Sequence, residues 1–171
     1  MGSPKALLSY KGKNFINTLI DVFAPCDETI VVLGYDADRV RAGITSPATI
    51  VVNLHPERGQ LSSLQCGLGA VRHADAVMFT PVDYPAISSG TVAQLLPYAG
   101  AFAMPRYEGR RGHPVLINRQ LVEEIIGCST SARDVIRAHD PVYVEVGDPG
   151  ILEDVDDPAA YARLTQEVMA R

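Results

Sequence analysis

Two aspartates, Asp83 and Asp156, stand where buried strands are expected to end, a position suited to binding a hard cation. Asp83 follows the apolar run at residues 76–80 and lies between two prolines, which leave its backbone little freedom. Asp154 and Asp156 would share one side of an extended chain, because side chains alternate along a strand. Carboxylate oxygens are preferred Mg²⁺ ligands, so we expect Asp83 and Asp156 to hold one Mg²⁺. A turn-forming Asp83 and a helix-capping Asp157 are the structural alternatives.

Positive side chains at two other places could meet an anion. Lys5 follows a small, turn-prone stretch, as in loops that bring a point charge to a phosphate. A solvated lysine near a terminus is the alternative. Arg110, Arg111 and His113 lie in a glycine-bracketed turn, which is typical either of an anion site or of an exposed hairpin tip. His113 has the chemistry of a general base, although the sequence shows no partner carboxylate for it.

A polar segment after the expected strand at residues 49–53 has the composition of a ligand-binding loop. Asn53 ends this strand, Gly59 lies in the following loop, and Ser62 and Ser63 open a helix. Either serine could simply cap that helix.

Two glycines inside the same helix, Gly67 and Gly69, each cost about 1 kcal/mol relative to alanine. We therefore expect close packing there, against either the sheet or a flat ligand.

Short β-branched runs alternate with amphipathic stretches, and this pattern predicts the elements that position these residues. We expect strands at residues 28–34, 49–53, 76–80, 101–104, 114–118 and 142–147. We expect helices at residues 14–24, 36–42 (capped by Asp36), 61–73, 88–96, 119–126, 131–138 and 158–170. The repetition predicts a single α/β domain over residues 1–171, with a three-layer, Rossmann-like, mostly parallel sheet. Ligands of such sheets bind beyond the carboxyl ends of the strands.

The composition is that of an ordinary globular domain and argues against several classes of function. The chain has 171 residues, 47% of them hydrophobic and 20% charged, with a net charge of -5. This balance argues against disorder, and a mildly acidic chain is not expected to bind nucleic acid. No apolar run is long enough to span a bilayer, so no membrane association is expected. Three widely separated cysteines predict reduced thiols and a cytoplasmic location.

Five segments in a fixed order resemble the MobA-like NTP transferase family, and within it the molybdenum cofactor cytidylyltransferase branch. Residues 1–8 match the second half of the family's first signature in register. The other four segments are residues 53–67 (through Asn53, Gly59, Ser63 and Gly67), 81–85, 112–116 and 154–158. Two positions depart from the family pattern, because proline lies at 56 rather than 54 and Asp157 replaces a threonine. The Gly-His-Pro segment favours CTP as the donor.

The resemblance implies an enzyme that moves a CMP or GMP group from an NTP to a phosphate acceptor such as molybdopterin, releasing pyrophosphate. Lys5 and Asp83 would be catalytic, and Asp83 and Asp156 would hold Mg²⁺. The nucleotide would be bound by Gly2, Lys5, Asn53, Gly59, Ser63 and Gly67. Arg111 and His113 would bind the acceptor, and a molybdoenzyme would be a protein partner.

The main departure from the family is at the start of the chain, which begins inside the first signature. The family's first strand and glycine-rich loop precede this point, and we expect about 15–20 residues upstream of Met1, one strand plus one loop. A protein that truly began at Met1 would have a gap in the centre of its sheet. It would turn over NTP weakly or not at all, because the loop amides carry most triphosphate contacts.

Two other functions are compatible with the same residues. One is a related nucleotidyltransferase with a different phosphorylated acceptor, such as a sugar phosphate. The other is a non-catalytic relative, a nucleotide-binding chaperone or cofactor-insertion factor that has kept the fold. Binding of Mg²⁺ and NTP without pyrophosphate release would identify the second.

Overall fold

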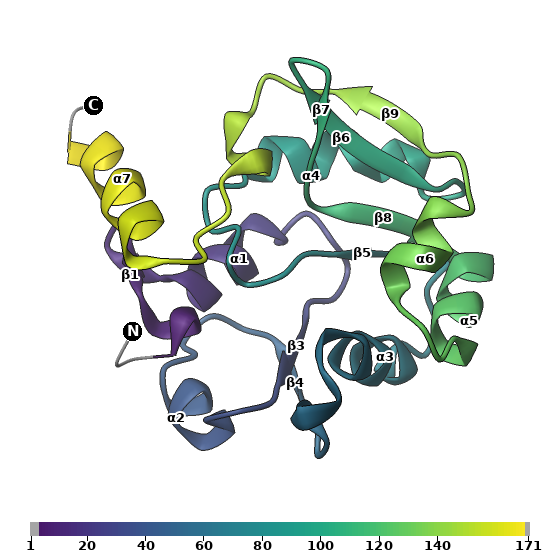
Figure 1. The fold of residues 1–171 in the computed structure, drawn as a ribbon, viewed down its shortest axis with the longest axis horizontal. Coiled ribbons are helices and arrows are strands. Elements are labelled where there is room, and N and C mark those ends of the chain that lie inside the picture. Colours follow the sequence, from purple (N-terminus) through teal and green to yellow (C-terminus); the bar gives the residue numbers. More distant parts are fainter. Residues whose placement is uncertain (1–3, 170–171) are drawn as a thin grey trace.

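The computed structural model describes residues 4–169, in which strands and helices alternate (Figure 1). The strands are β1 (Ser9–Tyr10), β2 (Lys13–Asn14), β3 (Ile30–Leu33), β4 (Thr49–Val52), β5 (Ala76–Phe79), β6 (Ala103–Tyr107), β7 (Arg110–Arg111), β8 (Val115–Asn118) and β9 (Val142–Glu145). The α-helices are α1 (Phe15–Val22), α2 (Ala37–Ala42), α3 (Gln60–Ala70), α4 (Ser89–Leu95), α5 (Arg119–Gly127), α6 (Ala132–Arg137) and α7 (Pro158–Met169). Short 3₁₀ helices are η1 (Lys5–Leu7), η2 (Pro56–Arg58), η3 (Leu96–Tyr98) and η4 (Pro149–Leu152). The predicted nucleotide ligand Gly2 lies outside the described residues.

The larger sheet has the strand order β5-β8-β6-β7, with β9 also paired to β6. Strand β8 is antiparallel to both β5 and β6, whereas β9 is parallel to β6. Strands β5, β6 and β9 therefore run in one direction and β7 and β8 in the other, because a turn at Glu108 and Gly109 reverses the chain. The predicted α/β class is confirmed, and this tight turn gives the larger sheet its mixed strand direction.

The three-layer arrangement follows from the alternation of side chains along β8. Val115 and Ile117 pack into a core shared with α3 and α5. The residue between them, Leu116, faces the opposite side and packs against Leu95 of α4. Because successive side chains of a strand point to opposite faces, one strand supplies both cores. Helices therefore cover both faces of the larger sheet.

Strands β3 and β4 form a separate two-stranded parallel sheet. Within residues 4–169, β3 pairs only with β4, and β5 pairs only with β8. Helix α3 packs against both sheets: a Cβ added at Gly67 would lie 2.8 Å from Val32 Cγ2, and Leu68 joins the core of the larger sheet. The close packing expected at Gly67 is thus present, and its cause is the sheet. At Gly69 an added Cβ would have no neighbour within 4 Å, so the sheet does not pack closely there. The upstream strand stays a prediction.

Helix starts confirm some of the expected caps and correct others. Asp157 Oδ1 accepts a 2.7 Å hydrogen bond from Ala160 N, as predicted for the start of α7. Asp36 precedes α2 but makes no capping hydrogen bond, because its backbone is left-handed (φ 55°) rather than extended. Helix α3 begins directly after Gly59, so Ser62 and Ser63 lie inside its first turn and are not N-caps.

The segment that carries Lys5 is ordered by packing that the sequence pattern did not predict. Lys5 begins η1, and the chain then forms the β1–β2 hairpin. Tyr161 of α7 donates a 2.9 Å hydrogen bond to the Ser9 backbone oxygen, which fixes this hairpin to the last helix. Among the residues described, no helix is both long and apolar enough to cross a membrane.

Candidate active site

Asp83, Asp154 and Asp156 form a cluster, here called the acidic cluster, in which one oxygen of each carboxylate lies within 4.8 Å of the other two. Val155 N donates a 2.9 Å hydrogen bond to the Asp83 backbone oxygen, which joins the two segments. The Val155 side chain is buried in the core with Tyr10. Asp154 and Asp156 flank this buried residue and lie together with Asp83, as the predicted alternation requires.

Lys5 lies against the acidic cluster. Its Nζ donates a 2.7 Å hydrogen bond to Asp156 Oδ1 and lies 3.9 Å from Asp83 Oδ2. The Asp83 side chain is 17% exposed and that of Asp156 is 71% exposed, so the cluster runs from the interior to the surface. One ammonium group faces three carboxylates, and the site is therefore short of positive charge.

Burial and mutual repulsion make this shortage of positive charge costly. Burial raises the pKa of Asp83, and the negative charge of Asp156 raises it further, against a hydrogen bond from its own backbone and the charge of Lys5. Burial also raises the pKa of Asp154, with the charges of Asp83 and Asp156 adding to the effect. Among residues 4–169 no donor reaches the buried Oδ1 of Asp83. An oxygen without a partner, beside two further carboxylates, fits a divalent cation.

Tyr84 and His113 form an aromatic pair beside the acidic cluster. Their ring centroids are 4.4 Å apart, and the Tyr84 hydroxyl donates a 3.5 Å hydrogen bond to Asp154 Oδ2. Burial lowers the pKa of His113 to about 4, against a hydrogen bond to the Phe79 backbone. Burial, followed by the nearby carboxylates, raises the pKa of Tyr84 to about 12. At neutral pH the imidazole is therefore uncharged and supports the Tyr84 ring, while the phenol remains a donor; contact of His113 with an acceptor stays a prediction.

Asn53 holds together the polar segment between β4 and α3. The Asn53 side chain donates to Ser62 Oγ at 2.9 Å and to Ser63 Oγ at 3.0 Å, and it accepts from His55 N at 2.9 Å. The residue is only 6% exposed. Its side chain therefore positions the loop against the first turn of α3. Gly59 directly precedes α3 and has a positive φ of 84°, and an added Cβ there would have no neighbour within 4 Å.

The structure brings some of the predicted residues together and keeps others apart. Lys5, Asp83 and Asp156 are in direct contact. Asn53 and Ser63 form a second group, and among the described residues no hydrogen bond or ion pair joins it to the first. Gly67, predicted to line the nucleotide, packs on β3. Arg111 is exposed on β7, two residues before His113.

The sequence reasoning did not assign a role to two residues of the site. The spacing of Asp154 and Asp156 already placed Asp154 on the same side, so the signal for it was present. Tyr84 carried no such signal. Its contacts with His113 and Asp154 depend on how three distant segments pack.

Comparison with known proteins gives matches in sequence. Residues 1–142 match the model of the MobA-like NTP transferase domain. A probable molybdenum cofactor guanylyltransferase from Bacillus cytotoxicus is 30% identical over 96 residues, which cover 55% of this chain and 48% of that protein. The match thus spans about half the length of the curated relative.

Solved structures match over nearly the whole chain. An Rv0371c homologue from Mycobacterium sp. strain JC1 has a TM-score of 0.84 and 27% identity, covering 99% of this chain and 90% of that one. Rv0371c from Mycobacterium tuberculosis H37Rv, solved in complex with manganese, has a TM-score of 0.79 and 25% identity, covering 96% and 93%. The family model spans most of the chain. The fold and the acidic cluster beyond β5 are consistent with this match. The chain belongs to the MobA-like NTP transferase family.

Proposed function

We propose that this chain is a Mg²⁺-dependent nucleotidyltransferase. It transfers a CMP or GMP group from an NTP to a phosphorylated acceptor of the molybdopterin kind and releases pyrophosphate; a molybdoenzyme that receives the product is the expected partner. The observation that carries the proposal is Lys5 held beside Asp83 and Asp156 at the end of β5. A lysine and paired carboxylates are the groups that in-line displacement at phosphorus needs, since this chemistry depends on positioning and charge neutralisation.

Asp83 and Asp156 would hold the divalent ion, with Asp154 within reach of the same position. When bound, the ion neutralises charge on the phosphate oxygens. The Asp83 oxygen that lacks a donor and the excess of carboxylates over cations support this assignment. So does the manganese complex of Rv0371c, a protein of the same fold.

Lys5 and the carboxylates would have complementary tasks in the reaction. An oxygen of the acceptor phosphate attacks the α-phosphorus of the NTP, and the bond between that phosphorus and the oxygen bridging to the β-phosphate breaks. Pyrophosphate leaves with the electron pair of this bond. The Lys5 ammonium, steadied by its hydrogen bond to Asp156, would neutralise the triphosphate. Asp156 and Asp83 would exchange part of their contact with Lys5 for the divalent ion.

The second polar group would serve the nucleoside. Asn53 fixes Ser62 and Ser63 in the first turn of α3, and the open space at Gly59 leaves the start of this helix accessible. Gly67 would act indirectly, because its lack of a side chain brings α3 onto β3. The Gly-His-Pro segment favours CTP, whereas the matched Bacillus protein is named a guanylyltransferase, so the proposal covers both bases.

The decisive experiment measures pyrophosphate release with CTP and with GTP, each with and without molybdopterin and Mg²⁺. Asp83→Asn removes the central carboxylate and should abolish both Mg²⁺-dependent NTP binding and turnover. The matched control is Asp75→Asn, which changes an exposed aspartate just before β5 and should behave as the unmodified protein. An Asp83→Asn protein that retains both properties removes Asp83 from the site.

Calorimetry with Mg²⁺ and each NTP separates the remaining functions. NTP binding without pyrophosphate release, with molybdopterin present, identifies a binding module instead of an enzyme. Turnover with a sugar phosphate in place of molybdopterin identifies a transferase with another acceptor. Failure to bind either NTP in the presence of Mg²⁺ overturns the proposal for this chain.

A further inference from the structure

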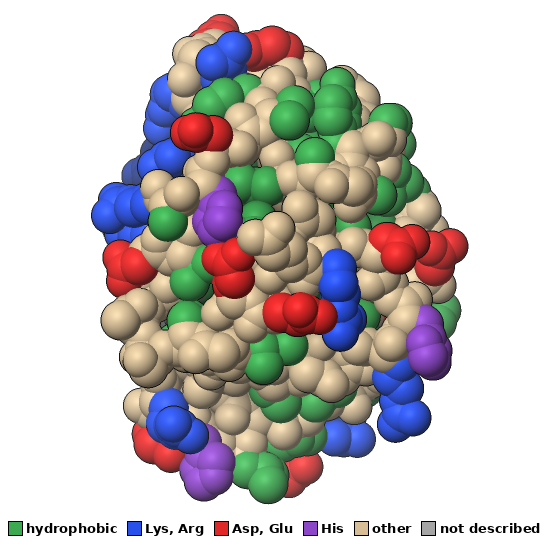
Figure 2. All heavy atoms as spheres, turned by 90° about the vertical axis from the view of Figure 1, so that its right-hand side faces the viewer, with side chains coloured by type: hydrophobic (Ala, Val, Ile, Leu, Met, Phe, Trp, Pro, Cys, Tyr) green, Lys and Arg blue, Asp and Glu red, His purple; other side chains and the backbone are tan. Residues whose placement is uncertain are grey.

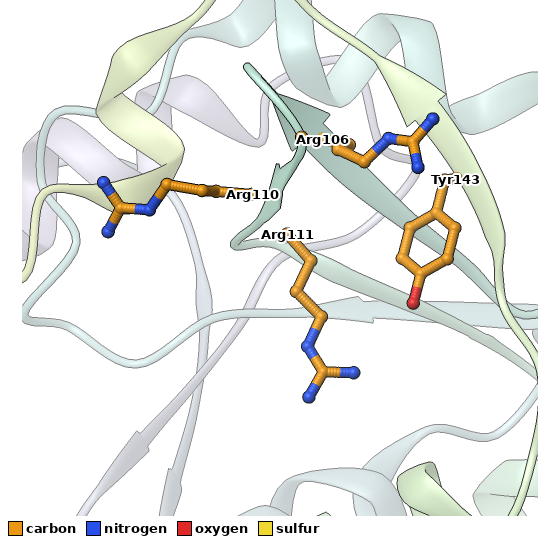
Figure 3. Close-up of a pocket in the computed structure, with 5 residues that line it drawn as sticks. Arg106, Arg110, Arg111 and Tyr143 are labelled. Atoms are coloured by element: carbon orange, nitrogen blue, oxygen red, sulfur yellow. The ribbon is translucent and has the colours of Figure 1, made fainter.

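A second charged group, here called the arginine hairpin, lies on strands β6 and β7. Arg106 is paired with Arg111 across the two strands, and Tyr107 is paired with Arg110. Cross-strand partners lie on the same face of a sheet, whereas neighbours along a strand point to opposite faces. Arg106 and Arg111 therefore share one face, and Arg110 belongs to the other. Figure 3 shows the Arg110 and Arg111 side chains leaving the hairpin in different directions.

Tyr143 of β9 completes the face that carries Arg106 and Arg111. Strand β9 is parallel to β6, with Tyr143 opposite Met104 and Glu145 opposite Arg106. The Arg106 guanidinium lies 5.1 Å from the centre of the Tyr143 ring, and its Nε forms an ion pair with Glu145. Arg106 is thus held in place before any ligand arrives, which lowers the entropic cost of binding one.

The charge on the arginine hairpin is only partly compensated. Glu145 pairs with Arg106, but within residues 4–169 no carboxylate forms an ion pair with Arg110 or Arg111. Like charges directly opposite each other across two strands destabilise a sheet. The chain as a whole has a net charge of -5, so the local positive charge of the hairpin contrasts with the acidity of the whole chain. On the face shown in Figure 2, positive side chains gather along the upper left edge, with some acidic side chains among them.

The arginine hairpin borders an open cavity of about 480 Å³, lined by Arg106, Gly109, Arg110, Arg111 and Tyr143 (Figure 3). Gly109 leaves room at the turn, because a Cβ built on it would have no neighbour within 4 Å. Two guanidinium groups on one face can each donate paired hydrogen bonds to phosphate oxygens.

We propose that the face formed by Arg106, Arg111 and Tyr143 binds a phosphomonoester dianion, and that this dianion belongs to the acceptor substrate. Arg111 is two residues from His113, whose ring packs on Tyr84 next to Asp83. His113 N also donates a 3.1 Å hydrogen bond to the Ile151 oxygen, which ties the end of the hairpin to the segment leading to Asp154. The cavity is therefore connected to the acidic cluster by a short, well-packed segment.

The identification of the dianion with the acceptor rests on the proposed function, but the binding site itself does not. Binding is therefore measured without NTP or divalent metal, with inorganic phosphate and phenyl phosphate as probes. Arginine Nε–H signals in ¹H–¹⁵N spectra report on the guanidinium groups directly. We expect both probes to shift the Arg106 and Arg111 signals in the millimolar range or below.

Three variants with the same loss of charge locate the site. Arg111→Gln should weaken phosphate binding at least about tenfold, because it removes a charged donor pair. Arg110 also borders the cavity, but its side chain leaves the opposite face of the hairpin, so Arg110→Gln removes the same charge and should weaken binding less than about threefold. Arg133→Gln, on the exposed side of α6, should have no effect. Equal losses from Arg110→Gln and Arg111→Gln, or no binding by the unmodified chain, overturn the proposal.

Asp83→Asn distinguishes this inference from the proposed function. It should leave phosphate binding intact, and a loss there would place the anion at the acidic cluster instead of the arginine hairpin. If the chain turns over NTP, Arg111→Gln should raise the KM for the acceptor at least about fivefold with the KM for NTP unchanged. A raised KM for NTP alone would show that the arginine hairpin serves the donor, and the assignment to the acceptor would be wrong.

Discussion

The acidic cluster and the arginine hairpin each hold several like charges together with a single opposite charge. Lys5 is that opposite charge among Asp83, Asp154 and Asp156, and Glu145 plays the same part beside the hairpin. The two regions differ in depth: the side chain of the opposite charge Lys5 is 31% exposed, whereas that of Glu145 is 61% exposed. Because water screens exposed charges, changes at the acidic cluster should have larger effects than matched changes at the hairpin.

The largest effect is expected from Lys5→Met, which should change two properties in opposite directions. NTP turnover should fall about 100-fold or more, since a fixed charge at the triphosphate is lost. Affinity for Mn²⁺ without nucleotide should rise by on the order of tenfold, because the cation no longer competes with an ammonium group. Electron paramagnetic resonance of free Mn²⁺ measures this affinity. Lys13→Met is the matched control, because it changes an exposed lysine paired with Asp21. A fall in Mn²⁺ affinity would show that Lys5 organises the carboxylates instead of competing with the metal.

His113 lies between the two charged regions, and it should make the protein less stable in acid. Its pKa is lowered from 6.5 to about 4 by burial, so the unfolded chain binds a proton more readily than the folded one. Its contribution to stability is present above pH 6.5 and is lost as the pH falls towards about 4. The loss reaches at most about 3 kcal/mol. Urea unfolding at several pH values, compared with His113→Gln, measures it. Parallel pH profiles of the two proteins would contradict the burial of a neutral imidazole.

How far the sequence predicts these regions depends on the range of the contacts involved. The proximity of Asp83 and Asp156 followed from a rule about strand ends, and the extra carboxylate Asp154 followed from local alternation. The start of α3 was predicted less well, because Ser62 and Ser63 look like caps until Asn53 is seen to bind both. In such cases the local pattern is real, but a side chain from another element decides its role.

The arginine hairpin shows where sequence reasoning stops. The strand expected at residues 101–104 ends before Arg106, but β6 continues to Tyr107 through its pairing with β7 and β9. The contact of Arg106 with Tyr143 joins residues that are far apart in the chain. It depends on which strands pair and in what register. Neither is fixed by periodicity, which specifies only the face on which each side chain lies.

Glu145→Gln tests the same comparison at the surface. Removal of its charge should raise the affinity of the arginine hairpin for phosphate by about two- to fivefold, the range expected for an exposed ion pair. The direction matches that expected for Lys5→Met and Mn²⁺, with the signs of the charges reversed. Glu123→Gln, which breaks the exposed 3.1 Å ion pair with Arg119, is the control and should leave phosphate affinity unchanged. An effect as large as that of Lys5→Met would mean that depth does not distinguish the two regions.

The smallest effect is expected from Tyr84→Phe, which removes one hydroxyl and keeps the ring on His113. Its hydrogen bond to Asp154 is long, at 3.5 Å, so its loss should weaken Mn²⁺ binding only about two- to threefold. Tyr98→Phe, at an exposed tyrosine, is the control. Because the ring is retained, the acid sensitivity assigned to His113 should persist in this variant. Tighter Mn²⁺ binding by Tyr84→Phe would instead show that the hydroxyl competes with the cation for Asp154, and that Tyr84 acts on the acidic cluster in the same way as Lys5.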